Sequence, residues 1–226
     1  VPNAATNGTV YVSDGTNNST STESFTNLGY ISTATGYWSN GSTWLGGTKP
    51  GNTDKVTIAA STKVTLDNED GTSHLTINQN GEFDNGATRL IIAASGKITN
   101  NGTFTGSTGN VYFNGVGTVE GTNAVTFNNL TINTGALTLT KIPTIDGVFT
   151  INGGYVSPAP IYTSNSTLSY NVTYSRFDEW NAVGTGTIGT TPGYPNNVTI
   201  NTGTFTLLNN DAGTERAIAG NLLVNS

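Results

Sequence analysis

The chain has 226 residues, of which 34% are hydrophobic and only 10% are charged, and 29 of them are glycines. Its 8 basic and 14 acidic residues give a formal net charge of −6, so it lacks the basic surface that neutralises phosphates, and we expect no nucleic-acid partner. Cysteine is absent, which excludes disulfides and thiolate zinc sites, and no apolar run approaches the roughly 18 residues of a membrane span, so no membrane insertion is expected.

Residues 1–53 are polar and irregular, yet they carry several large aromatic residues ahead of the first clear strand at 55–58. A stack of repeats exposes its apolar core at the end unless something covers it. We therefore expect residues 1–53 to form an irregular N-terminal capping region and residues 54–226 to form repeats. The aromatic residues of the cap are Tyr30, Tyr37, Trp38 and Trp44.

An acidic run, DNEDG, follows at residues 67–71. Asp67, Glu69 and Asp70 supply hard oxygens of the kind that hold Ca²⁺, which makes them the candidate calcium ligands. The run lacks the EF-hand spacing and the Gly-Gly-x-Gly-x-Asp repeat of calcium-binding β-rolls. The alternative is a solvated corner between two coils, in which case the chain binds no cofactor.

Two carboxylates follow in the next strand. Glu82 and Asp84 are two residues apart, so in a strand they project from the same face, as an acid/base pair would require. Aligning Gly81 with Gly96 places Lys97 on the neighbouring coil, beside the carboxylates. We interpret this group as a ladder of surface charges without chemistry.

The clearest feature is a repeated unit, NNLTINTGALTL at 128–139 and NNVTINTGTFTL at 196–207. Within each copy apolar residues alternate with polar ones, which is the pattern of strands with one buried face. A Gly-x-apolar-x segment, the second half of the unit, recurs along the chain. Weaker copies of the first half begin at Lys55, His74, Arg89 and Val148.

Strands this short cannot each bury a core, but stacked coils bury a continuous one and pair their backbone groups with the coils above and below. The repeats therefore predict an all-β fold, a right-handed parallel β-helix, with about seven to nine coils from Lys55 onward. An antiparallel β-sandwich is the alternative. In a β-helix the aliphatic residues share one core and the threonines between them point outward. The aliphatic residues are Leu75, Ile77, Leu130, Ile132, Val198 and Ile200, and the threonines are Thr76, Thr131 and Thr199.

The repeat is interrupted at 161–195, where aromatic residues crowd into an interval without a clear copy. We interpret this interval as a longer coil or a lateral excursion. Exposed aromatic rings beside polar groups hold sugar rings in many proteins, so Tyr174, Arg176, Phe177 and Trp180 are the candidate glycan-binding residues. The alternative is that these rings pack the excursion onto the flank of the solenoid.

The last residues, GNLLVNS, begin another copy of the unit without its second half. We therefore expect the chain to be a fragment of a longer protein, truncated at its C-terminus. Leu222 and Val224 should pair with the coil that holds Val198 and Ile200, and should leave an open edge. Further repeats, or another chain, are expected to stack after Ser226.

Two segments share a recognisable pattern. Residues 173–200 contain Tyr-x-Arg-x-x-Glu-Trp followed by GYPNNV, and residues 36–58 contain GYWSNGSTW ahead of a strand. Both segments resemble parts of the β-helical repeat regions of large surface proteins that Bacteroidetes export by type IX secretion. The resemblance implies an extracellular location, at the bacterial cell surface or secreted, and it leaves the activity open.

These features together predict a structural or adhesive module, a rigid β-solenoid stalk or display segment of a bacterial surface protein. The alternative is a carbohydrate-binding or polysaccharide-degrading β-helix protein, with surface glycans as partners. A degrading enzyme would need charged residues that converge on one groove, and the charged residues here are scattered. His74 is the only histidine and no Gly-x-Ser-x-Gly motif occurs. No catalytic residue is predicted, and we expect that the chain is not an enzyme.

Overall fold

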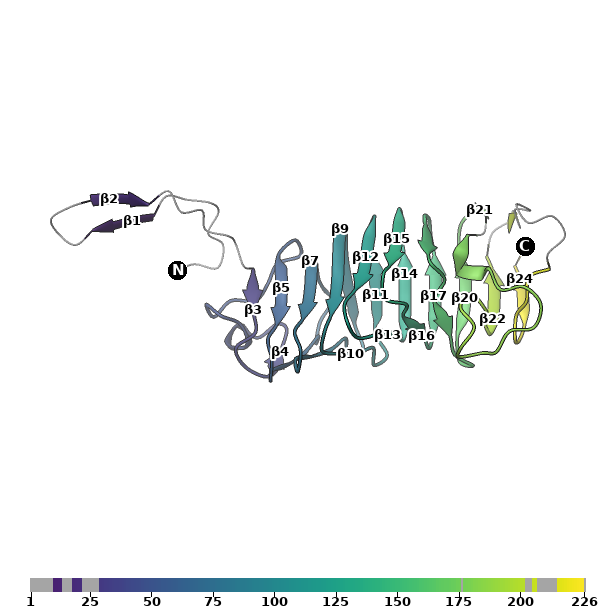
Figure 1. The fold of residues 1–226 in the computed structure, drawn as a ribbon, viewed down its shortest axis with the longest axis horizontal. Coiled ribbons are helices and arrows are strands. Elements are labelled where there is room, and N and C mark those ends of the chain that lie inside the picture. Colours follow the sequence, from purple (N-terminus) through teal and green to yellow (C-terminus); the bar gives the residue numbers. More distant parts are fainter. Residues whose placement is uncertain are drawn as a thin grey trace.

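The computed structural model describes the backbone of residues 10–13, 18–21, 29–175, 177–201, 205–206 and 215–225. It describes side chains for 29–173, 177–201 and 215–225. From residue 30 onward, short strands wind into an elongated rod of stacked coils (Figure 1). An antiparallel hairpin of β1 (Val10–Ser13) and β2 (Asn18–Ser21) precedes the rod.

Each coil has three faces, which we name A, B and C. Faces A and B belong to one 13-stranded sheet. The sheet continues from one face to the other through β7 (Asp70–Ile77) and β9 (Arg89–Asn100), because the first half of each strand lies on face B and the second half on face A. Face A contains β3 (Tyr30–Ile31), β5 (Lys55–Ile58), these second halves, β12 (Gly117–Glu120), β15 (Ala136–Leu139) and β18 (Tyr155–Ser157).

Face B is the longest of the three. After the first halves of β7 and β9 it contains β11 (Asn110–Phe113), β14 (Asn129–Ile132), β17 (Val148–Ile151), β20 (Thr167–Tyr170), β22 (Asn197–Ile200) and β24 (Leu222–Val224). Face B thus stacks eight strands, and the turn that holds β3 and β4 adds none to it.

Face C consists of a four-stranded and a three-stranded sheet. The first contains β4 (Gly36–Tyr37), β6 (Lys63–Thr65), β8 (Glu82–Asp84) and β10 (Thr103–Thr105). The second contains β13 (Thr126–Phe127), β16 (Thr144–Ile145) and β19 (Ile161–Tyr162). The remaining elements are the pair β21 (Tyr174–Ser175) and β23 (Phe205–Thr206), and the 3₁₀ turns η1 (Gly41–Thr43) and η2 (Asp178–Trp180).

The pairing confirms the predicted β-solenoid and excludes the sandwich. Every strand pair on faces A, B and C is parallel, and antiparallel pairing among the described residues is confined to the β1–β2 hairpin and two isolated bridges. The eight coils fall within the predicted seven to nine. In the described part of the chain, no helix has the length and apolar character needed to cross a membrane.

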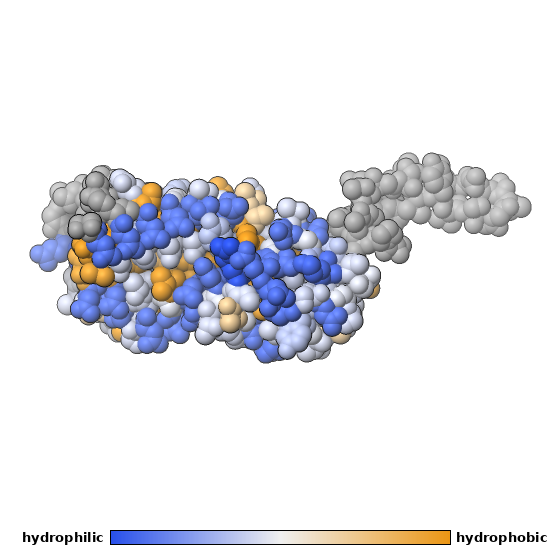
Figure 2. All heavy atoms as spheres, turned by 180° about the vertical axis from the view of Figure 1, so that it is seen from behind, coloured by the Kyte–Doolittle hydropathy of each residue, from blue (hydrophilic) through white to orange (hydrophobic). Residues whose placement is uncertain are grey.

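One apolar column runs through the rod. The six aliphatic residues predicted to share the core are at most 6% exposed, and hydrophilic side chains cover much of the face seen in Figure 2. Thr76 and Thr199 are partly exposed, as expected, but Thr131 is only 5% exposed. It lies on the outer side of β14 and Asn110 Nδ2 donates a hydrogen bond to its hydroxyl oxygen at 3.0 Å, so neighbouring polar residues cover it rather than the core.

Aromatic rings extend this column toward the N-terminus. Trp38 and Trp44 are 1% and 2% exposed, and their ring centroids lie 5.1 Å apart. Trp38 contacts Phe83 at 6.0 Å, edge to face. Coiling itself starts before the expected boundary at residues 53/54, because β3 and β4 already pair in parallel with β5 and β6.

Asparagines form a ladder directly after the strands of face B. Side-chain amides link Asn133 to Asn114, Asn171 to Asn152, Asn201 to Asn171 and Asn225 to Asn201, at 2.6–3.1 Å. Backbone bonds continue the same stacking, since the N–H of Asn152 donates to the carbonyl of Ile132 at 2.9 Å. The ladder gives the polar groups at this corner hydrogen-bond partners in the neighbouring coil.

Two adjacent residues of β15 test which side of the strand faces the core. Leu137 is fully buried and Thr138 is exposed. We expect Leu137→Ala to lower the free energy of unfolding by about 2–5 kcal/mol, because it leaves a cavity, and Thr138→Ala to change it by less than about 0.5 kcal/mol. Urea unfolding followed by circular dichroism measures both, and equal effects would contradict the core assignment.

Candidate functional site

The charged residues of face C form a ladder with a different partner from the one expected. Lys63 Nζ lies 2.6 Å from Glu82 Oε1 and 4.0 Å from Asp84 Oδ2. The hydrogen bond to Glu82 is the main cause of a raised pKa at Lys63. The carboxylates therefore serve a surface ion pair.

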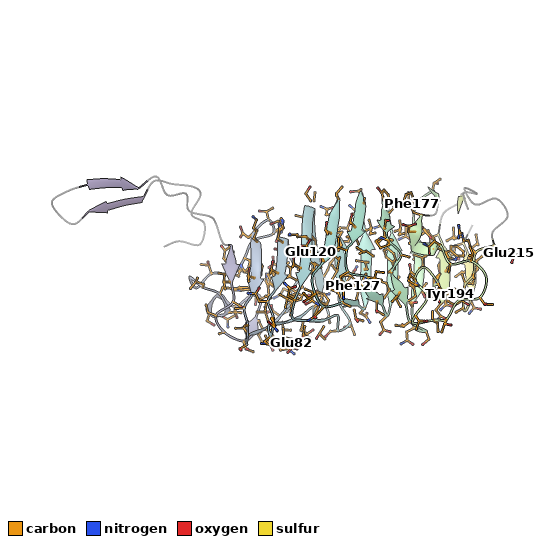
Figure 3. All side chains as sticks on the ribbon, viewed as in Figure 1. Glu82, Glu120, Phe127, Phe177, Tyr194 and Glu215 are labelled. Atoms are coloured by element: carbon orange, nitrogen blue, oxygen red, sulfur yellow. The ribbon has the colours of Figure 1, made fainter. Side chains whose placement is uncertain are left out.

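The prediction that Lys97 lies beside Glu82 was wrong. Lys97 lies on face A, where its Nζ contacts Glu120 Oε1 at 2.8 Å, and Figure 3 shows Glu82 and Glu120 on different parts of the rod. The hydrogen bonds from Lys97 and Thr99 lower the pKa of Glu120. The alignment failed because Gly81 precedes a strand of face C and Gly96 lies in one of face A.

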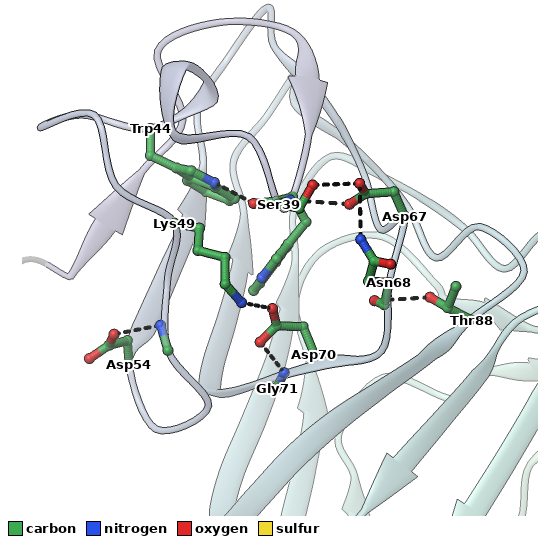
Figure 4. Close-up of polar contacts among 11 residues, drawn as sticks. Ser39, Trp44, Lys49, Asp54, Asp67, Asn68, Asp70, Gly71 and Thr88 are labelled. Atoms are coloured by element: carbon green, nitrogen blue, oxygen red, sulfur yellow. Dashed lines mark hydrogen bonds and ion pairs between the residues drawn. The ribbon is translucent and has the colours of Figure 1, made fainter.

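The three candidate calcium ligands have separate partners, and Figure 4 shows those of Asp67 and Asp70. Asp67 accepts hydrogen bonds from the backbone N–H and hydroxyl of Ser39, the latter at 2.5 Å. Asp70 is 6% exposed and accepts from Lys49 Nζ at 2.5 Å. In the described residues no group of three or more His, Cys, Asp or Glu side chains is placed to hold a metal ion.

The third of these candidates, Glu69, binds an arginine. Arg89 donates from Nε and one Nη to the two carboxylate oxygens of Glu69, at 3.0 and 2.8 Å. This bond lowers the pKa of Glu69 and raises that of Arg89. The acidic run thus joins neighbouring segments of the rod, and we build no metal site on it.

The candidate glycan residues are only partly described. Arg176 lies outside the described residues, and Tyr174 is placed only by its backbone in β21. Phe177 is 46% exposed and its ring lies 4.3 Å from that of Tyr155. Trp180 is 4% exposed and its indole N–H donates to the Ala217 carbonyl at 3.0 Å, which matches the packing alternative for this ring.

Glu179 was not among the candidate site residues, although it lies in the Tyr-x-Arg-x-x-Glu-Trp segment, and it anchors the excursion. It is fully buried in η2. Its Oε1 accepts hydrogen bonds from the Tyr170 hydroxyl at 2.9 Å and the Phe177 N–H at 2.8 Å, and Tyr162 donates to its backbone carbonyl at 2.9 Å. A buried carboxylate requires such partners. The sequence signal that could have identified Glu179 was the Glu-Trp pair at the end of the Tyr-x-Arg-x-x-Glu-Trp segment.

His74 lies on face A between two lysines. In the register of the sheet it pairs with Lys55 on β5 and Lys97 on β9. Burial, followed by the charges of these lysines, holds the pKa of His74 below its ordinary value, and Glu120 opposes the shift. Its Nδ1 is buried without a hydrogen-bond partner.

Searches of protein-family models, curated proteins and solved structures found no match to this chain.

A pH titration tests the environment of His74. The folded state favours the neutral imidazole, so the unfolded state takes up the proton first, and stability falls as the pH drops through the ordinary pKa of 6.5 toward the lower folded value. We expect wild type to lose more unfolding free energy than His74→Gln between about pH 7.5 and about pH 5. Wild type and the variant carry the same carboxylates. Equal losses of unfolding free energy in the two would therefore contradict a lowered pKa at His74.

Proposed function

We propose that the chain is a rigid, non-catalytic spacer, a β-solenoid stalk or display segment of a bacterial surface protein. The observation that supports this is the unbroken stacking of eight strands on face B over a single apolar column. Each coil is held by its neighbours through backbone pairing, the asparagine ladder and core contacts. Bending would have to break several of these interactions at once.

The proposed location rests on sequence resemblance alone. Residues 36–58 and 173–200 resemble repeat regions of Bacteroidetes proteins exported by type IX secretion, and this resemblance supports a location outside the cell. A spacer of this kind separates whatever is attached to its two ends, and it needs no cofactor.

The end of the rod at β24 offers a stacking surface. Leu222 and Val224 pair with Val198 and Ile200 in the expected register, and they are 51% and 60% exposed. Asn225 continues the ladder and presents the same amide to a following coil. We propose that β24 is covered by a further parallel coil with the pattern apolar-x-apolar-Asn, from further repeats or from another chain.

Paired spin labels test the rigidity. The chain has no cysteine, so Lys55→Cys and Thr199→Cys provide two unique sites on outward positions near opposite ends of the rod. At about 4.8 Å per coil we expect one narrow distance distribution on the order of 30 Å. Each single-cysteine variant serves as the control for unwanted pairing, and a broad distribution would contradict a rigid spacer.

Sedimentation tests the stacking surface. We expect the wild-type chain to self-associate as its concentration rises, because a second copy supplies the nearest substitute for the next coil. Leu222→Lys combined with Val224→Lys should remain monomeric, because charges on an edge strand block pairing, and Thr138→Lys on the outside of face A is the matched control. If the wild-type chain stays monomeric at every concentration, β24 is not an edge that binds another copy.

A further inference from the structure

A groove lies at the corner between faces A and C, where successive coils turn with different lengths. Residues 101–102 join β9 to β10, but residues 78–81 join β7 to β8 in the coil before and residues 121–125 join β12 to β13 in the coil after. A short corner between two longer ones leaves a hollow, and the groove has a volume of about 990 Å³.

Side-chain amides dominate this groove, and none of its lining residues is charged. Hydrogen bonds between the described residues do not use most of these amides. The side chains of Asn78, Gln79 and Asn80 have no hydrogen-bond partner among the described residues, and all three are exposed. The lining amides are Asn78, Gln79, Asn80, Asn101 and Asn123.

The floor and the far wall of the groove are held in place. Asn123 Nδ2 donates to the carbonyl of Gly102 at 2.7 Å, and the N–H of Thr122 donates to Asn101 Oδ1 at 3.0 Å. Gly102 is required here, because a Cβ at this position would lie 2.3 Å from the Gly81 carbonyl oxygen. This part of the groove is therefore formed before any ligand arrives, which reduces the entropy cost of binding.

We propose that this groove binds an uncharged oligosaccharide. Each free carboxamide offers a donor and an acceptor side by side, which matches the adjacent hydroxyl groups of a sugar. The lining has no cation to hold a uronate, sulfate or phosphate, and the whole chain carries a net charge of −6. The volume lies in the range of small-ligand sites, and three coils span about 10 Å, enough for more than one sugar ring.

This site differs from the aromatic one that the sequence indicated. It uses the corner residues that follow the third to fifth strands of face A, β7, β9 and β12, whereas Tyr155 and Phe177 lie near the opposite end of the rod. It also goes beyond the spacer function, since a rod that holds glycans would attach as well as separate.

Calorimetry with the complete chain tests the proposal. The probes are four neutral hexasaccharides, cellohexaose, xylohexaose, mannohexaose and maltohexaose, with hexagalacturonate as the charged comparison. We expect at least one neutral probe to bind and the charged probe not to bind. Asn78→Ala combined with Gln79→Ala should weaken binding about tenfold or more, through the loss of two hydrogen-bonding groups. Neither side chain has a hydrogen-bond partner among the described residues, so circular dichroism should show an unchanged fold.

Two further variants locate the binding. Phe177→Ala removes the exposed ring of the aromatic pair, and Thr138→Ala changes an exposed residue of face A that does not line the groove. Both should bind the probe as wild type does. The proposal fails if no neutral probe binds at millimolar concentration, if hexagalacturonate binds more tightly, or if Phe177→Ala abolishes binding while the Asn78/Gln79 variant retains it.

Discussion

The structure depends on one constraint, which is that each strand hydrogen-bonds to the equivalent strand of the coils before and after it. Parallel, in-register pairing places like residues above like along the rod. Apolar residues therefore form a continuous column, as with Leu130, Phe149 and Leu168 on face B, and asparagines form a ladder at one corner. A change in one coil alters the fit of both neighbours, so the stack behaves as a unit.

The same constraint leaves the corners free to vary, and the distinctive features of this chain occur there. A two-residue corner at 101–102 produces the amide-lined groove between longer neighbours. The connection at 171–196, between β20 and β22, carries an excursion whose position depends on buried Glu179 and Trp180. Binding properties on such a scaffold arise from corner length and composition rather than from the strands.

The candidate sites were predicted less well than the fold, for an identifiable reason. Glu82 was paired with Lys97 although it contacts Lys63, because the Gly-x-apolar-x segment looks the same on faces A and C. Residues that begin similar copies also lie on different faces, with His74 on face A and Arg89 on face B. Period-2 alternation reports which side of a strand is buried, but it does not report the face on which the strand lies. The amides of the groove were missed because they matter only through the lengths of the corners around them.

By itself the sequence determined the all-β solenoid, the inward position of residues such as Ile132 and Val198, and the register of Leu222 with its neighbour. These follow from local alternation and repetition, which any stacked arrangement must respect. Only the tertiary structure decided which surface residues meet, from the Arg89–Glu69 pair to the groove at Gly102. Such contacts join residues about one coil apart in the sequence, so they depend on the exact length of each turn, and a difference of one or two residues in a corner moves a side chain to a new partner.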